Sequence, residues 1–148
     1  MTFLAVPGGQ PAFAYAGQPM DVLAGLDGQP AGFAVANMTM PPHFAGPIPH
    51  AHDAFDEAIY VLSGQLHVLT DRGERVAEAG QLLVAPRGQR HGFRNPSDSQ
   101  VVVLGLWSPS AAGLAFMRDI GSALPASGPP DPTLMAEIYE RHSSRLLP

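Results

Sequence analysis

Two short groups of metal-binding residue types constrain this 148-residue chain more strongly than any other feature. The first group is His50 and His52, separated by one residue, with Glu57 five residues further on; the second contains His91. Side chains alternate along an extended chain, so both rings of a His-x-His pair point to the same side of a strand and can reach one ion. The residues between His52 and Glu57 give the chain room to turn back. The pattern therefore predicts a site built from imidazole and carboxylate ligands.

Both groups belong to longer patterns with regular spacing. Six residues separate Glu57 from Gly64, and the second group reads G-x5-P-x-G-x2-H-x3-N from Gly80 to Asn95 without a mismatch. The fifteen residues between the two patterns, 65–79, are enough for a hairpin. This paired arrangement resembles the signature of the cupin family. The order of strands and helices over residues 20–147 is more loosely similar to the bacterial single-domain cupins of the quercetin-dioxygenase-like group.

The resemblance implies an all-β fold, the cupin barrel (double-stranded β-helix or jelly roll), followed by C-terminal α-helices. It also implies one divalent metal ion held by His50, His52, Glu57 and His91. One position departs from the family pattern, because Phe44 stands where a glycine six residues before the first histidine is usual. We expect Gly46 to make the turn instead.

The residue types present narrow the chemistry of the site. Nitrogen and oxygen ligands suit Fe, Mn, Ni, Cu, Co or Zn, and one such divalent ion is the expected cofactor. The chain has no cysteine, which excludes zinc ribbons and iron-sulfur clusters. All eight positive residues are arginine, so no lysine is available for Schiff-base chemistry.

Charge and hydropathy exclude two further classes of protein. The net charge is −5 without a basic stripe, which argues against nucleic-acid binding. The one basic cluster, Arg87, Arg90 and Arg94, is typical of solvated loop charges, with an anionic substrate as the alternative. The first twenty residues carry no positive charge and are broken by prolines and glycines, unlike a signal peptide. No apolar run is long enough to span a membrane. We expect a cytoplasmic protein.

Apolar runs bounded by turn residues predict short strands at 31–40, 57–62, 65–70, 74–79, 81–85, 93–95 and 101–107. After Pro109 the apolar spacing becomes helical, and a second helix is expected after Asp131, a good N-cap followed by proline. The chain is therefore divided into an N-terminal segment 1–30, expected as an edge strand or dimer arm, a barrel 31–110, and C-terminal helices 111–148 packed on the barrel.

Residues two positions beyond a ligand on the same strand share its side of the sheet. Ile59 and Phe93 are therefore expected to line an apolar substrate pocket, with Asn37 and Leu106 joining from adjacent strands. His43, His67 and His142 are expected at the surface and not at the metal.

Four protein ligands on a six-coordinate metal leave two positions where a substrate and dioxygen or water can meet. The resemblance favours a metal-dependent dioxygenase for a phenolic or enol-type small molecule, with Glu57 as both ligand and proton acceptor. Two alternatives stay open: a metal-assisted cyclase or isomerase of the polyketide-cyclase cupin type, and a non-catalytic cupin that binds a small ligand. A homodimer is expected through the barrel edges, for which the apolar segment Phe13 to Leu26 is a candidate.

Overall fold

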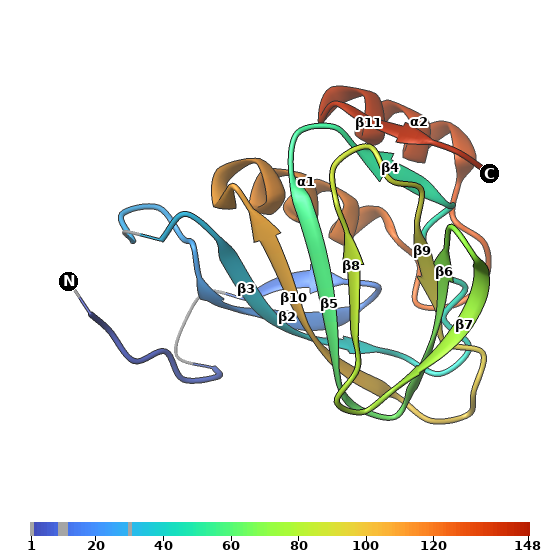
Figure 1. Cartoon of the computed structure of the whole chain (residues 1–148), viewed down its shortest axis with the longest axis horizontal. Coiled ribbons are helices and arrows are strands. Elements are labelled where there is room, and N and C mark those ends of the chain that lie inside the picture. Colours follow the sequence, from blue (N-terminus) through green and yellow to red (C-terminus); the bar gives the residue numbers. More distant parts are fainter. Residues whose placement is uncertain (1, 9–11, 30) are drawn as a thin grey trace.

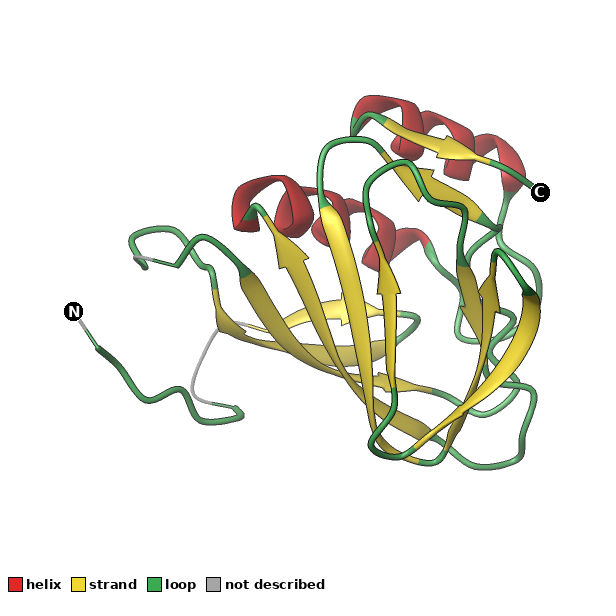
Figure 2. Cartoon of the chain, in the orientation of Figure 1, coloured by secondary structure: helices red, strands yellow, loops and turns green. Residues whose placement is uncertain are grey.

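The computed structural model describes residues 2–8, 12–29 and 31–148, which form a β-barrel with two helices at one end (Figures 1 and 2). The strands are β1 (Ala12–Tyr15), β2 (Gln18–Ala24), β3 (Ala34–Met40), β4 (His50–His52), β5 (Asp56–Ser63), β6 (Gln65–Thr70), β7 (Gly73–Glu78), β8 (Leu82–Ala85), β9 (Gly92–Arg94), β10 (Val101–Ser108) and β11 (Ser144–Leu146). The helices are α1 (Ser110–Ala123) and α2 (Pro132–Arg141).

The barrel is built from two antiparallel sheets and a short two-stranded one. The larger sheet has the order β1-β2-β3-β10-β5-β8, and the smaller has the order β7-β6-β9. Buried and half-buried residues alternate along β3 and β10, so one face of each strand is turned to the core. Met38 and Val103 are paired across these strands and meet in the interior. The barrel is therefore filled by side chains and is not a pore.

The strands predicted from the sequence are all present, with ends shifted by at most three residues. The largest shift is at β3, which begins at Ala34 because Gly32 and Phe33 form a bend. The N-terminal segment 1–30 was expected as an edge strand or as a dimer arm. Within it, β2 pairs with the chain's own β3, and β1 forms one edge of the larger sheet.

The two helices close one end of the barrel. The Asp131 side chain accepts hydrogen bonds from the backbone N–H groups of Thr133 and Leu134, at 2.8 and 3.2 Å, and begins α2 as the sequence predicts. The chain then turns back as β11, which pairs with β4 next to the helices (Figure 1). Neither helix of the described residues is long and apolar enough to cross a membrane.

Candidate metal centre

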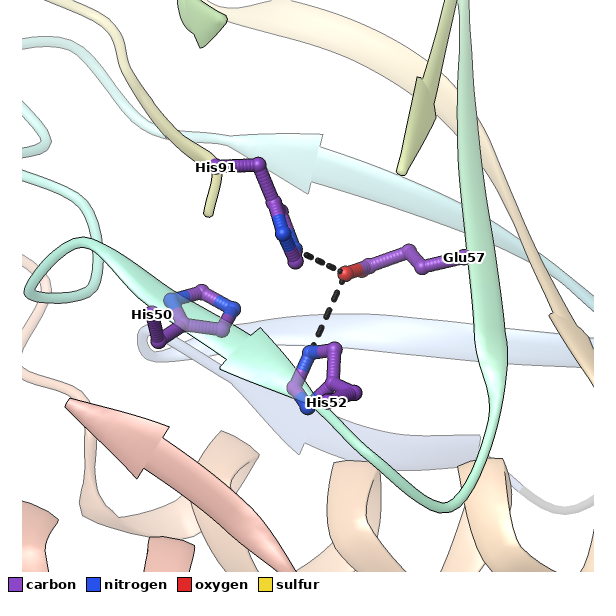
Figure 3. A group of neighbouring side chains, drawn as sticks. All are labelled: His50, His52, Glu57 and His91. Atoms are coloured by element: carbon purple, nitrogen blue, oxygen red, sulfur yellow. Dashed lines mark hydrogen bonds and ion pairs between the residues drawn. The ribbon is translucent and has the colours of Figure 1, made fainter. Parts of the chain in front are cut away.

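The four residues predicted as metal ligands converge inside the barrel, at the end closed by the helices. The ligand atoms of His50, His52, Glu57 and His91 all lie within 4.8 Å of one another, and all four side chains are buried. They come from β4, β5 and the loop before β9. Figure 3 shows the three rings and the carboxylate pointing toward one another.

The backbone brings the two histidine groups side by side. The N–H of His50 donates to the carbonyl of His91 at 2.9 Å, and the N–H of His91 donates to that of His50 at 2.8 Å. Residues in such an antiparallel bridge carry their side chains on the same face. Their ring centroids are accordingly 4.4 Å apart, although the residues are forty-one positions apart in sequence.

Each histidine ring is held through its Nδ1 atom. Nδ1 of His50 donates to the carbonyl of Ile48 at 2.8 Å, and Nδ1 of His91 donates to that of Gln89 at 3.0 Å. Nδ1 of His52 lies 2.7 Å from the Ser144 hydroxyl. These partners direct all three Nε2 atoms to the centre of the cluster. Such outer contacts fix the tautomer and orientation of metal-binding histidines.

The Glu57 carboxylate lies between the rings. Its Oε2 atom is 2.7 Å from Nε2 of His91, and its Oε1 atom accepts a hydrogen bond of 3.3 Å from the indole of Trp107. Burial acts to raise the pKa of Glu57, but the contacts with His52 and His91 outweigh it and hold the pKa well below its ordinary value. The group is therefore a carboxylate, as a metal ligand must be.

The histidine pKa values follow their positions around this carboxylate. Burial, together with the neighbouring rings, lowers the pKa of His50 from 6.5 to about 3, so that this ring is neutral near pH 7. Burial also acts to lower the pKa of His91, but the hydrogen bond and charge of Glu57 raise it above the ordinary value. The cluster thus contains one neutral ring, that of His50, and one hydrogen-bonded acid-base pair, His91 and Glu57. A cation can take the place of the proton shared by this pair.

One atom shows that the cluster is incomplete as a protein-only network. Nε2 of His52 is buried and makes no hydrogen bond within the described part of the chain, although it lies 3.2 Å from Oε2 of Glu57. A buried nitrogen without a partner is costly, and a metal ion would satisfy it. Three imidazoles and a carboxylate are also the ligand types that divalent transition metals accept. The residues therefore fit a metal ion, whose identity they leave open.

The departure at Phe44 has a structural explanation. Phe44 is buried and packs against Tyr15 and Phe93, with ring centroids 5.9 and 6.5 Å away. The assigned turn lies at Pro42 and His43, whereas Gly46 supplies a left-handed residue further on, with φ of +78°, where an added Cβ would overlap the carbonyl oxygen of Phe93. Gly46 is therefore needed for the close approach of its backbone to Phe93, and the expectation that it makes the turn stays a prediction.

Asn95, the last residue of the second motif, connects three backbone segments by hydrogen bonds. Asn95 is fully buried, and its amide donates to the carbonyls of Met40, Pro41 and Ser99 at 3.3, 2.9 and 2.7 Å. Its backbone N–H donates to Phe44. The motif asparagine therefore positions loops around the site and does not join the four ligands.

The four residues predicted to bind substrate lie in two different places. Phe93 lines the small cavity beside His50 and Glu57, and Ile59 is buried in the core on the same strand as Glu57. Asn37 and Leu106 lie on the opposite face of the larger sheet, because their strands turn Met38 and Trp107 inward. The expected contact of Asn37 and Leu106 with a substrate at the centre is not supported by this arrangement.

Sequence patterns did not reveal the residues that cover the centre. The cavity has a volume of about 10 Å³, at the lower limit for one water molecule. Besides the ligands it is lined by Tyr15, Phe116 and Tyr139, among other side chains. Burial raises the pKa of Tyr15 and of Tyr139, so both phenols keep their protons. These residues belong to β1, α1 and α2, outside both motifs.

The remaining histidines and the arginine cluster have other partners. His43 pairs with Asp98 at 2.8 Å and is exposed, and His67 contacts Glu74 at 3.1 Å on the barrel surface. His142 binds Asp119 at 2.7 Å. Arg87, Arg90 and Arg94 are engaged with Asp56, the Leu147 carbonyl and Glu74, respectively. None of these side chains reaches the centre formed by the four ligands.

Fold and site together define a cupin β-barrel with a candidate centre for one metal ion. Residues 36–108 match the family described as the cupin domain, and this match supports the cupin superfamily. A germin-like protein, subfamily 2 member 3, from Arabidopsis thaliana is 32% identical over 97 residues, which are 62% of this chain and 43% of that protein. The chain thus spans less than half the length of this relative.

Solved structures share the fold at low identity. A cupin 2 conserved barrel domain protein from Salinispora arenicola has a TM-score of 0.55 and 18% identity, over 89% of this chain and 91% of that one. The polyketide cyclase RemF from Streptomyces resistomycificus has a TM-score of 0.59 and 22% identity, over 73% and 80%. The all-β cupin barrel with C-terminal helices, predicted from the sequence, is confirmed.

Proposed function

We propose that this chain is a metal-dependent oxygenase, similar to quercetin dioxygenases, for a phenolic or enol-type small molecule. The observation that carries the proposal is the set of three Nε2 atoms and one carboxylate within 4.8 Å of one another, each ring held from behind. Four ligands leave about two positions of a six-coordinate ion for other molecules. The bound ion would supply Lewis acidity and, when redox-active, chemistry with dioxygen.

The residues of the chain have defined roles in this proposal. His50, His52, His91 and Glu57 hold the ion. Phe93 offers an apolar, aromatic wall suited to a flat organic substrate. The role of Glu57 as proton acceptor requires that its bond to His91 is given up first, because that bond lowers the pKa of the carboxyl and makes it a weak base.

One observation favours a second candidate function, a non-catalytic cupin that binds a small ligand. The cavity of about 10 Å³ beside the four ligands is far smaller than the several hundred Å³ typical of pockets for organic molecules. Within this cavity, an organic substrate would require α1 or α2 to move, because the larger pockets that touch His91 and Glu57, of about 250 and 180 Å³, lie outside it. A barrel that holds a metal and a ligand about the size of a water molecule requires no such movement.

Metal content and oxygen dependence test these functions. The purified protein and a His50→Ala/His91→Ala variant are analysed for metal, and both are then assayed with flavonols and other enols in aerated and in anaerobic buffer. We expect about one equivalent of metal in the wild type, none in the variant, and turnover only with oxygen. Equal turnover without oxygen would identify a cyclase or isomerase, and metal binding without any turnover would support the ligand-binding cupin.

A further inference from the structure

The side chain of Tyr139 has a feature that packing alone does not explain. Its ring is 1% exposed and packs against His50, with ring centroids 4.9 Å apart at an angle of 70°. Its hydroxyl is buried and has no hydrogen-bond partner among the described residues. Buried hydroxyls are nearly always paired, and a phenylalanine would fill the same space without this cost.

The position of Tyr139 suggests what the missing partner is. The residue lines the same small cavity as His50 and Glu57, and Tyr15 enters this cavity from β1. The Tyr139 ring also lies nearly parallel to that of His52, at 12° and 6.2 Å between centroids. Two ligand rings are therefore neighbours of Tyr139, and the cavity that it lines has room for about one water-sized atom.

A phenol is a hydrogen-bond donor with one proton to give, and it forms its strongest bonds to charged acceptors. An ion held by three neutral imidazoles and one carboxylate keeps a positive charge, which attracts a small anion to an open position. An anionic atom at that position would be the acceptor that Tyr139 lacks.

We propose that the Tyr139 hydroxyl donates a hydrogen bond to an anionic ligand atom at the metal, such as the oxygen of a deprotonated phenol or enol. The inference rests on the metal site of the proposed function. Tyr139 belongs to α2, outside residues 36–108 that match the cupin domain, so this contact is a property of the C-terminal helix and not of the barrel. Through this hydrogen bond, α2 favours the binding of anionic ligands at the metal over neutral ones.

Azide binding to the cobalt-loaded full chain tests the proposal. Wild type, Tyr139→Phe and the control Tyr60→Phe are loaded with Co²⁺ and titrated with sodium azide, followed by visible absorption. Tyr60 is a matched control because it is 37% exposed and lies outside the cavity. We expect the azide dissociation constant to rise on the order of 10- to 100-fold in Tyr139→Phe only, as for lost bonds to charged groups, with Co²⁺ content unchanged.

Thermal unfolding of the metal-free proteins gives a second measurement. Because the hydroxyl has no partner in the protein, Tyr139→Phe should be as stable as wild type or more stable. A lower melting temperature would reveal a protein partner and overturn the proposal. Equal azide affinity of wild type and Tyr139→Phe would also overturn it and leave the proposed function standing, whereas a wild type that binds no Co²⁺ would overturn both.

Discussion

The Ser144 hydroxyl lies 2.7 Å from Nδ1 of His52, and these two residues are 92 positions apart. The contact is buried and joins β11 to β4, which pair so that Ser144 stands opposite His52. With Nδ1–H donating to this hydroxyl, the lone pair of the ring is on Nε2, directed to the centre. The C-terminal strand β11 therefore sets the tautomer of His52, although His52 belongs to a motif much earlier in the sequence.

Replacement of Ser144 by alanine should weaken metal binding without loss of the fold. The His52 ring would lose the partner that holds it, and loss of such outer contacts typically costs about 10- to 100-fold in metal affinity. Metal titration followed by the fluorescence of Trp107, which donates to Glu57, measures this affinity. Ser122→Ala on the surface of α1 is the control. Unchanged affinity in Ser144→Ala would show that His52 is oriented by other contacts.

Gly46→Ala should be strongly destabilising. Alanine at a positive φ costs about 1–2 kcal/mol by itself, and the Cβ would also overlap the backbone of Phe93, for roughly 1–3 kcal/mol more. Gly73→Ala separates the two effects, because φ is +91° there but nothing lies within 4 Å of the added Cβ. The free energy of unfolding in urea should fall further for Gly46→Ala. Equal losses of unfolding free energy in Gly46→Ala and Gly73→Ala would mean that the backbone near Gly46 moves to accommodate the added Cβ at no energetic cost.

The contact between the helices should weaken in acid. Asp119 of α1 accepts hydrogen bonds from His142 and Arg141, and chiefly the bond from His142 holds the pKa of Asp119 below its ordinary 3.8. A lowered carboxyl pKa stabilises the fold fully above 3.8, and this contribution is lost as the pH falls through the folded-state pKa. Wild type should therefore be more stable than Asp119→Asn near neutral pH, with a difference that shrinks in acid. A difference independent of pH would contradict this assignment.

We propose that two copies associate through the outer face of β5 and β8. Leu62, Leu82 and Val84 are 42–60% exposed on these neighbouring strands. The row carries no charge, so two copies with a net charge of −5 can meet there without close repulsion. Sedimentation should give twice 15.6 kDa for wild type and 15.6 kDa for Leu82→Glu/Val84→Glu. Val76→Glu on β7 is the control, and a monomeric wild type would refute the dimer.

The barrel could be predicted from the sequence because its strands are short apolar runs bounded by turn residues. The ligand geometry was predictable for a similar reason: His50 and His52 are close in sequence, and the spacing around His91 is regular. The strand β11 was not foreseen, because three residues with one apolar side chain have no pattern of their own. Its conformation depends on pairing with β4, which is a tertiary contact.

The placement of the pocket residues was only partly predictable. The rule that every second residue shares a side correctly joins Phe93 to the ligands' side of the barrel. The same rule cannot say which face of a neighbouring strand is inside, and Asn37 and Leu106 lie on the less buried face of the larger sheet. Tyr139 and Ser144 follow no motif, so their approach to the centre appears only in three dimensions.

The pairing of β11 with β4 places the completion of the centre at the far end of the sequence from its ligands. All four ligand residues precede Gly92, whereas Tyr139 and Ser144 follow both long strands and the first helix. A chain cut after α1 would therefore keep every ligand and lose the residue that orients His52 and the ring that covers His50.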